Sequence, residues 1–142
     1  MTDDTFRPTE LSDLECYDFL RSQELGRLAY HLLGEVHIVP VNYAVDDDNR
    51  LIFRTAEGSK LFGITMNDDV AFEVDQLLGD EAISVIVRGR AHLLVADSAY
   101  VAERVRLRPW INTPKFNVVA IDPNEVTGRR LHMHRPWRSM RG

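Results

Sequence analysis

The run from Ile83 to Val95 is the part of this sequence that most restricts the fold. It is rich in β-branched and other apolar residues and carries Gly89 in its middle. A glycine inside a strand often marks a bulge or a bend at the corner of a barrel. One long, bent strand of this kind predicts a small β-barrel.

The remaining pattern adds further strands and short helices. Predicted strands are Leu28–Leu32 and Val36–Val45 as a hairpin about Gly34, then Leu51–Thr55, Val70–Val74, and a final pair, Asn117–Ile121 and Glu125–Met133, about Pro123. Predicted helices begin with the capping box of Ser12 and Glu15 and end near Gln23, span Ser59 to Met66, and run from Asp97 or Ser98 to about Leu107. Most connections are too short for crossover helices, so we expect an antiparallel, mainly β, α+β protein.

Bulk properties narrow the class of protein. With 142 residues the chain fits one domain, residues 1–142. A net charge of -5 argues against a nucleic acid or a membrane surface as partner, although arginines gather near the end of the chain. The first residues lack the features of a signal peptide and no apolar run could span a bilayer, so we expect a cytoplasmic location. Cys16 is the single cysteine, which excludes an internal disulfide.

The segment FRTAEGSKL, residues 53–61, has the composition of a phosphate-binding site. Arg54 offers a bidentate donor and Lys60 a point charge, while Thr55 and Ser59 add hydroxyl groups at a strand end that opens a helix. The spacing matches neither a Walker A loop nor a Rossmann fingerprint. A surface turn with solvated cations is the alternative interpretation.

The segment Pro40-Val41-Asn42-Tyr43 is the second unusual feature. Proline and asparagine are unfavourable in a central strand, so this stretch is either an edge strand running into a turn or a place where free backbone groups meet the polar edge of a planar ligand.

Two further groups of titratable residues carry weaker patterns. His132 and His134 alternate on one strand face, but two ligands do not make a metal site and no metal is expected. Glu73 and Asp75 also share a face, and we interpret them as the polar side of an edge strand rather than as a catalytic pair.

The order of short motifs resembles a known family. LGRLAY, PVNYAV, LIFRTAEGSKL, VAFEVD, SVIVRGRA, RPW and VTGRRL, between Leu25 and Leu131, follow one another as in the pyridoxamine 5'-phosphate oxidase-like family. The chain is similar to its short branch, which includes nitroimidazole-resistance proteins. This resemblance implies an antiparallel split β-barrel of about six strands with short flanking helices, which binds FMN as a homodimer.

The resemblance also assigns roles to residues. It implies that Arg54, Thr55, Ser59 and Lys60 hold the FMN phosphate and that Pro40, Val41, Asn42 and Tyr43 line the isoalloxazine ring. Ser84 stands where the family places a polar residue facing the pyrimidine edge of the flavin. Trp110, with Arg129 or Arg130, is implied to reach the cofactor from a second protomer.

These features predict an FMN-dependent oxidoreductase with an unknown small-molecule substrate. Ala82-Ile83 stands where relatives of this branch usually have a tryptophan, and the C-terminal arginine and histidine arrangement of true pyridoxamine phosphate oxidases is absent. Vitamin B6 oxidation is therefore not expected. A flavin or haem carrier without turnover, and a deazaflavin-dependent reductase, are the alternatives.

Overall fold

The computed structural model describes residues 8–56, 58–105 and 117–133. In chain order the elements are β1 (Thr9–Glu10), α1 (Asp13–Ser22), β2 (Leu25–Leu32), β3 (Glu35–Asn42), β4 (Ala44–Val45), β5 (Leu51–Thr55), α2 (Ser59–Met66), β6 (Asp69–Leu78), β7 (Glu81–Leu94), a 3-10 helix (Ala96–Tyr100), α3 (Val101–Arg104) and β8 (Asn117–His132). The fold class predicted from the sequence, a mainly β, antiparallel split barrel with short helices, is confirmed.

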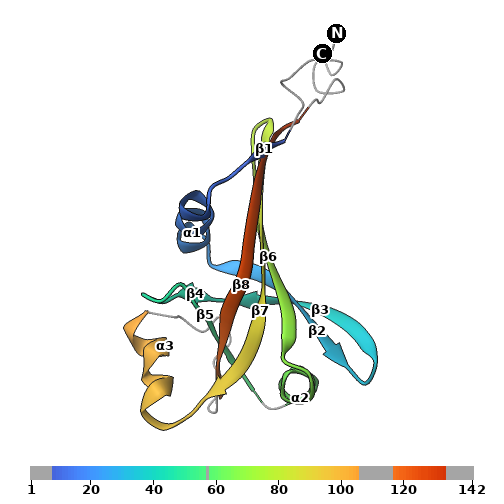
Figure 1. Ribbon diagram of the computed structural model, residues 1–142, viewed down its shortest axis with the longest axis vertical. Helices are drawn as coiled ribbons and strands as arrows, with labels where there is room; N and C mark the ends of the chain where they lie inside the picture. Colours follow the sequence, from blue (N-terminus) through green and yellow to red (C-terminus); the bar gives the residue numbers. More distant parts are fainter. Residues whose placement is uncertain (1–7, 57, 106–116, 134–142) are drawn as a thin grey trace.

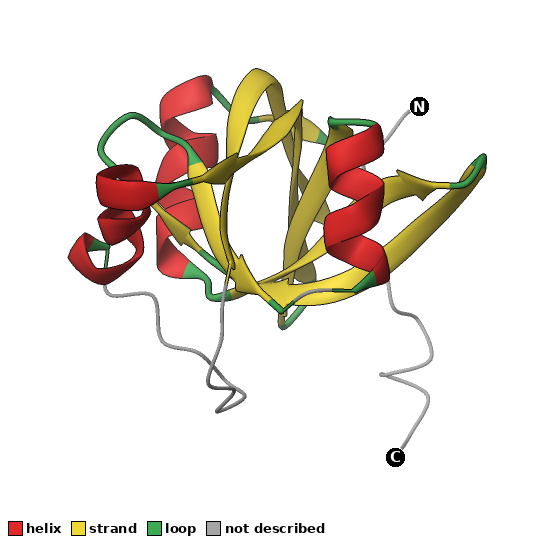
Figure 2. Ribbon diagram, turned by 90° about the horizontal axis from the view of Figure 1, so that it is seen from below, coloured by secondary structure: helices red, strands yellow, loops and turns green. Residues whose placement is uncertain are grey.

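The strands form one curled antiparallel sheet in the order β3-β2-β6-β7-β8-β5-β4, with β1 paired to β8. The long strands β6, β7 and β8 run along the molecule, while α1, α2 and α3 lie around the curled sheet (Figures 1 and 2). Burial alternates along β7, where Val85, Val87 and Ala91 face the core. We call the opposite face of the sheet, which bears Ser84, Ile86 and Arg88, the outer face.

Two groups of buried side chains fill the molecule. The main core lies inside the curled sheet and includes Leu28, Phe53 and Phe72, none of which is exposed. A smaller cluster under α3 contains Ile52, Val101 and Ala120. Cys16 lies on α1 in the main core, as a small apolar side chain.

Two helices, α1 and α2, begin where the sequence predicted them to begin. The Ser12 hydroxyl accepts the Glu15 N–H, and the Glu15 carboxylate accepts the Ser12 N–H, so the predicted capping box is confirmed. The bounds of α2 are those predicted. The third predicted helix instead begins as a 3-10 turn at Ala96, and its predicted end at Leu107 lies outside the described residues.

The predicted break at Pro123 is wrong, because β8 continues through it and pairs with β7 along its length. The predicted irregularity at Gly89 is confirmed: Gly89 lies opposite Pro123 at a register shift, and a Cβ there would be 2.2 Å from the Asp122 carbonyl oxygen. Proline lacks the N–H of a regular ladder, and the bulge accommodates that loss without ending the strand.

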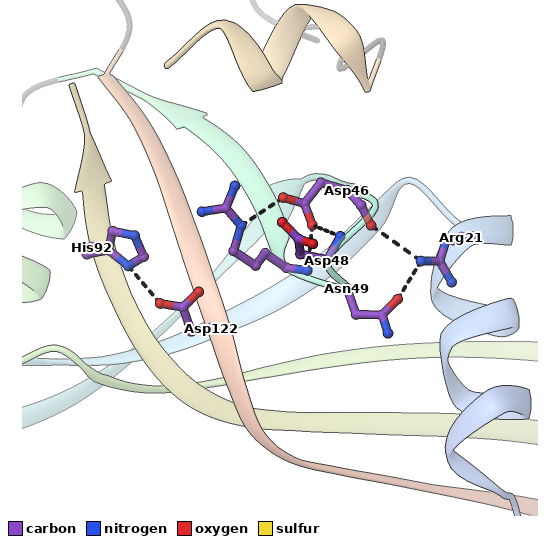
Figure 3. Close-up of polar contacts among 7 residues, drawn as sticks. Arg21, Asp46, Asp48, Asn49, His92 and Asp122 are labelled. Carbon is purple, nitrogen blue, oxygen red and sulfur yellow. Dashed lines mark hydrogen bonds and ion pairs between the residues drawn. The ribbon is translucent and has the colours of Figure 1, made fainter. Parts of the chain in front are cut away.

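The acidic turn after β4 is held by its own buried carboxylate (Figure 3). Asp46 is 4% exposed and accepts hydrogen bonds from the Asp48 and Arg50 N–H groups and from Arg50 Nε at 2.7 Å. Arg21 of α1 donates to the Asp46 carbonyl and to the Asn49 side chain, which joins the turn to α1.

A second polar contact in Figure 3 joins β7 to β8 on the outer face, where His92 Nδ1 lies 3.1 Å from Asp122.

Candidate functional site

The predicted phosphate-binding residues lie at the junction between β5 and α2. Arg54 and Thr55 end β5, and Ser59 and Lys60 begin α2 after Gly58, which gives the helix no side-chain cap. The N–H groups of the first helical turn have no intrahelical partner and favour an anion. This junction thus has the local geometry that the sequence predicted.

Lys60 is the most informative side chain of the junction. It is half-buried, and none of the described residues forms an ion pair with it. Burial lowers the pKa of its ammonium group below the ordinary value of 10.5, since desolvation disfavours the charged form. A partly desolvated cation beside a helix N-terminus is suited to an anionic ligand.

The two residues at the end of β5 differ in what they can offer. Thr55 is 5% exposed and its hydroxyl donates to the Ala56 carbonyl at 3.1 Å, so this group already serves the turn. Arg54 is half-buried on the outer face, because side chains alternate along the strand. The Arg54 side chain thus lies on the opposite face of β5 from the Thr55 side chain.

The predicted ring-binding segment divides into outward and inward residues. Pro40 and Asn42 lie on the outer face of β3, which is an edge strand, as one of the two interpretations of this segment predicted. Val41 and Tyr43 point into the core. The Tyr43 hydroxyl donates to the Leu20 carbonyl at 2.6 Å, and its burial raises the pKa. Tyr43 thus joins this segment to α1 on the core side of the sheet.

The sheet register brings this segment toward the phosphate junction. Asn42 ends β3, and two residues later Ala44 of β4 pairs with Ile52, which precedes Arg54 by two residues in β5. The ring segment and the phosphate junction therefore lie within a few residues of one paired position of β4 and β5.

Ser84 and Arg129 lie elsewhere. They are register partners on the outer face of β7 and β8, and both line a groove of about 750 Å³. Arg54 pairs with Val118, and Val118 with Leu94, which is ten residues along β7 from Ser84. At about 3.3 Å per residue this is roughly 30 Å along the strand. Trp110 and His134 lie outside the described residues.

The hydrogen-bond partners around Ser84 were not predicted from the sequence. Glu73 and Asp75 were predicted to lie on an edge strand. This prediction is wrong, because β6 pairs with β2 on one side and with β7 on the other. Arg27 Nη1 of β2 contacts Glu73 at 2.9 Å and Asp75 at 2.7 Å, and Ser84 Oγ donates to Glu73 at 3.3 Å. The charge alternation at Glu73 and Asp75 was the available signal, but it did not identify Arg27, which lies 46 residues away.

Comparison with known proteins now assigns the family. The family model described as pyridoxamine 5'-phosphate oxidase matches residues 12–130. The chain belongs to the pyridoxamine 5'-phosphate oxidase family. An uncharacterised protein from Mycobacterium tuberculosis is 36% identical over 130 residues, which cover 86% of this chain and 84% of that protein.

Solved structures agree with this membership. The FAD binding protein from Mycobacterium smegmatis is 38% identical, with a TM-score of 0.77, over 89% of this chain and 100% of that chain. A heme binding protein from the same organism has a TM-score of 0.70 over 87% of this chain and 55% of that one, and at 13% identity it shares the fold alone. These two structural neighbours are thus a FAD binding protein and a heme binding protein.

Among the described residues, no group of three or more His, Cys, Asp or Glu side chains is arranged to hold a metal ion. Within the same part of the chain, no helix is long and apolar enough to cross a membrane.

Proposed function

We propose that this member of the pyridoxamine 5'-phosphate oxidase family is an FMN-dependent oxidoreductase whose phosphate site is the junction of β5 and α2. The observation that carries the proposal is Lys60, a half-buried cation without a counter-ion in the described chain, beside an uncapped helix start. A bound phosphate would supply the missing charge.

The residues of this chain then have distinct tasks. Lys60 and Arg54 hold the phosphate, with the N–H groups at Ser59 and its neighbours, and Thr55 fixes the turn. Pro40 and Asn42 border the ring on the edge strand, while Val41 and Tyr43 support it from the core. The flavin supplies the electron transfer itself, so that the protein's contribution is binding, orientation and exclusion of water.

A second copy of the chain completes the site in this proposal. Ser84 and Arg129 are separated from the phosphate junction by roughly 30 Å along β7, which is too far for residues of one chain to contact one compact cofactor. We therefore assign Ser84, Arg129 and Trp110 to the partner of a homodimer.

The first test is a titration with FMN, followed by flavin fluorescence. Arg54→Ala combined with Lys60→Ala removes both cations and should weaken FMN binding by at least about 100-fold, since charge-assisted hydrogen bonds are the strong ones. Arg90→Ala is the matched control, because Arg90 is exposed and paired with Asp68. Unchanged FMN affinity in the double variant would refute the phosphate site.

FAD is a second candidate cofactor, favoured by the similarity to the FAD binding protein from Mycobacterium smegmatis. Both flavins carry a phosphate next to the ribityl chain, so the same junction serves either. Competition among FMN, FAD, a deazaflavin and haem for the purified protein identifies the preferred ligand.

A carrier without turnover is the other function to test. It is suggested by Ala82-Ile83, which leaves the start of β7 without a large aromatic side chain. Steady-state assays with NADH, NADPH and nitroaromatic acceptors distinguish the two. An oxidoreductase exceeds the rate of free flavin, whereas a carrier does not.

A further inference from the structure

A short row of polar side chains crosses three strands of the outer face. We call Arg27, Glu73 and Ser84, with the neighbouring Asp75, the polar row. The register places Arg27 opposite Glu73 and Asp75 opposite Ser84, so all four side chains point to the same face. Arg27 binds both carboxylates, and Glu73 Oε2 accepts the Ser84 hydroxyl.

This arrangement fixes the hydrogen-bonding character of Ser84. A serine hydroxyl has one proton to donate and two lone pairs to accept with. In the polar row that proton goes to Glu73 Oε2, while Arg27 holds Oε1 at 2.9 Å and favours the ionised carboxylate. Ser84 therefore offers only acceptor positions to anything else.

A ligand can reach the Ser84 oxygen. Ser84 lines the groove of about 750 Å³ together with Ile86, Thr127 and Arg129. Glu73 is half-buried, with 29% of its side chain exposed, and it is not among the residues that line the groove. Ser84 is thus the member of the pair that meets a ligand, and Glu73 acts behind it.

We propose that Glu73 is a positioning residue that holds the Ser84 hydroxyl as a hydrogen-bond acceptor and so selects a ligand edge that donates a ring N–H. The inference rests on the proposed function for its ligand, since the imide N3–H of a flavin is a donor of this class. Asp75 shares Arg27 but has no hydrogen bond to Ser84, so it does not fix the hydroxyl.

The surrounding charges predict how the selection depends on pH. Burial and the nearby Asp75 raise the pKa of Glu73, and Arg27 opposes them. From β7, Ser84 and Arg88 flank Glu73 on the outer face, and Arg129 of β8 lies beyond Ser84. Once Glu73 is protonated it can donate to Ser84, which frees the serine proton. The preference for a donor ligand is therefore present above the pKa of Glu73 and is lost as the pH falls through it.

The test compares FMN with N3-methyl-FMN, which lacks the imide donor. Wild-type protein at neutral pH should bind FMN about 10-fold more tightly than the methylated flavin, the value of roughly one good hydrogen bond. The preference should decline on acidification. Dissociation constants from flavin fluorescence give both results.

Glu73→Gln separates hydrogen bonding from steric exclusion of the methyl group. Arg27 only donates, so it takes the amide oxygen of the new side chain, and the amide NH₂ faces Ser84. Ser84 then has its proton free, and the preference for FMN should fall below about 3-fold. Asp75→Asn is the matched control and should keep the wild-type preference.

The outcomes are distinct. A full preference in Glu73→Gln would overturn the inference, because a methyl clash alone would persist with Ser84 unchanged. A full preference in Ser84→Ala would overturn it too, by showing that Ser84 is not the contact. If wild-type protein bound neither flavin, the proposed function would fail instead.

Discussion

At the scale of single residues, Lys60 links ligand binding to stability. Its folded pKa is lowered by burial, so the unfolded chain binds more protons between that pKa and 10.5. The free energy of unfolding of the ligand-free protein should therefore rise with pH through this window. Replacing Lys60 by an uncharged residue should remove its contribution to this pH dependence of the free energy of unfolding.

Lys60→Met tests that link. We expect the ligand-free variant to melt at a higher temperature than wild type at neutral pH, because the desolvated charge is gone, and to bind FMN about 10-fold or more weakly. Arg90→Met, at an exposed position, should change neither. A lower melting temperature for Lys60→Met would mean that its charge is compensated in the free protein. Melting curves and FMN titrations supply the two readings.

At the scale of elements, the packing of α2 on β2 positions the phosphate junction. A Cβ at Gly63 would lie 2.3 Å from the His31 carbonyl oxygen, a backbone atom that cannot move aside alone. Gly63→Ala should push α2 outward, lower the free energy of unfolding by about 1–3 kcal/mol and weaken FMN binding. Thr65→Ala on the exposed side of the same helix is the control. Chemical denaturation and FMN titration measure both effects.

Local signals explain which elements the sequence predicted well. The capping box at Ser12 and the break at Gly58 act within a few residues, so α1 and α2 were predictable. Pro123 misled because a bulge opposite Gly89, 34 residues away in the chain, absorbs the missing N–H. The polar row was hidden for the same reason, since its members meet only through strand pairing between β2, β6 and β7.

The candidate site shows the same division. The cations at the β5–α2 junction lie within one short segment and were found from composition. The inward direction of Tyr43 and the use of the Thr55 hydroxyl by its own turn depend on tertiary packing, and no short pattern encodes them.

At the scale of the whole molecule, the proposal requires two copies of the chain for each flavin site. A chain with Arg54→Ala and Lys60→Ala lacks the cations that hold the phosphate. A chain with Ser84→Ala and Arg129→Ala lacks the side chains that contact the cofactor of the partner chain. Each alone should bind FMN weakly. When the two are unfolded together and refolded, half of the dimers are mixed and each mixed dimer regains one site, so about a quarter of all sites should bind tightly. If the refolded mixture regained no tight FMN binding, the phosphate-binding residues and Ser84 with Arg129 would have to act within one chain.

The most direct test of the central claim is the ratio of the dissociation constants of FMN and riboflavin, which differ only in the phosphate. If the β5–α2 junction holds that phosphate through Lys60 and Arg54, FMN should bind wild-type protein at least about 100-fold more tightly than riboflavin. The ratio should approach one in the variant that lacks both cations. Equal affinities for FMN and riboflavin in the wild-type protein would contradict the account.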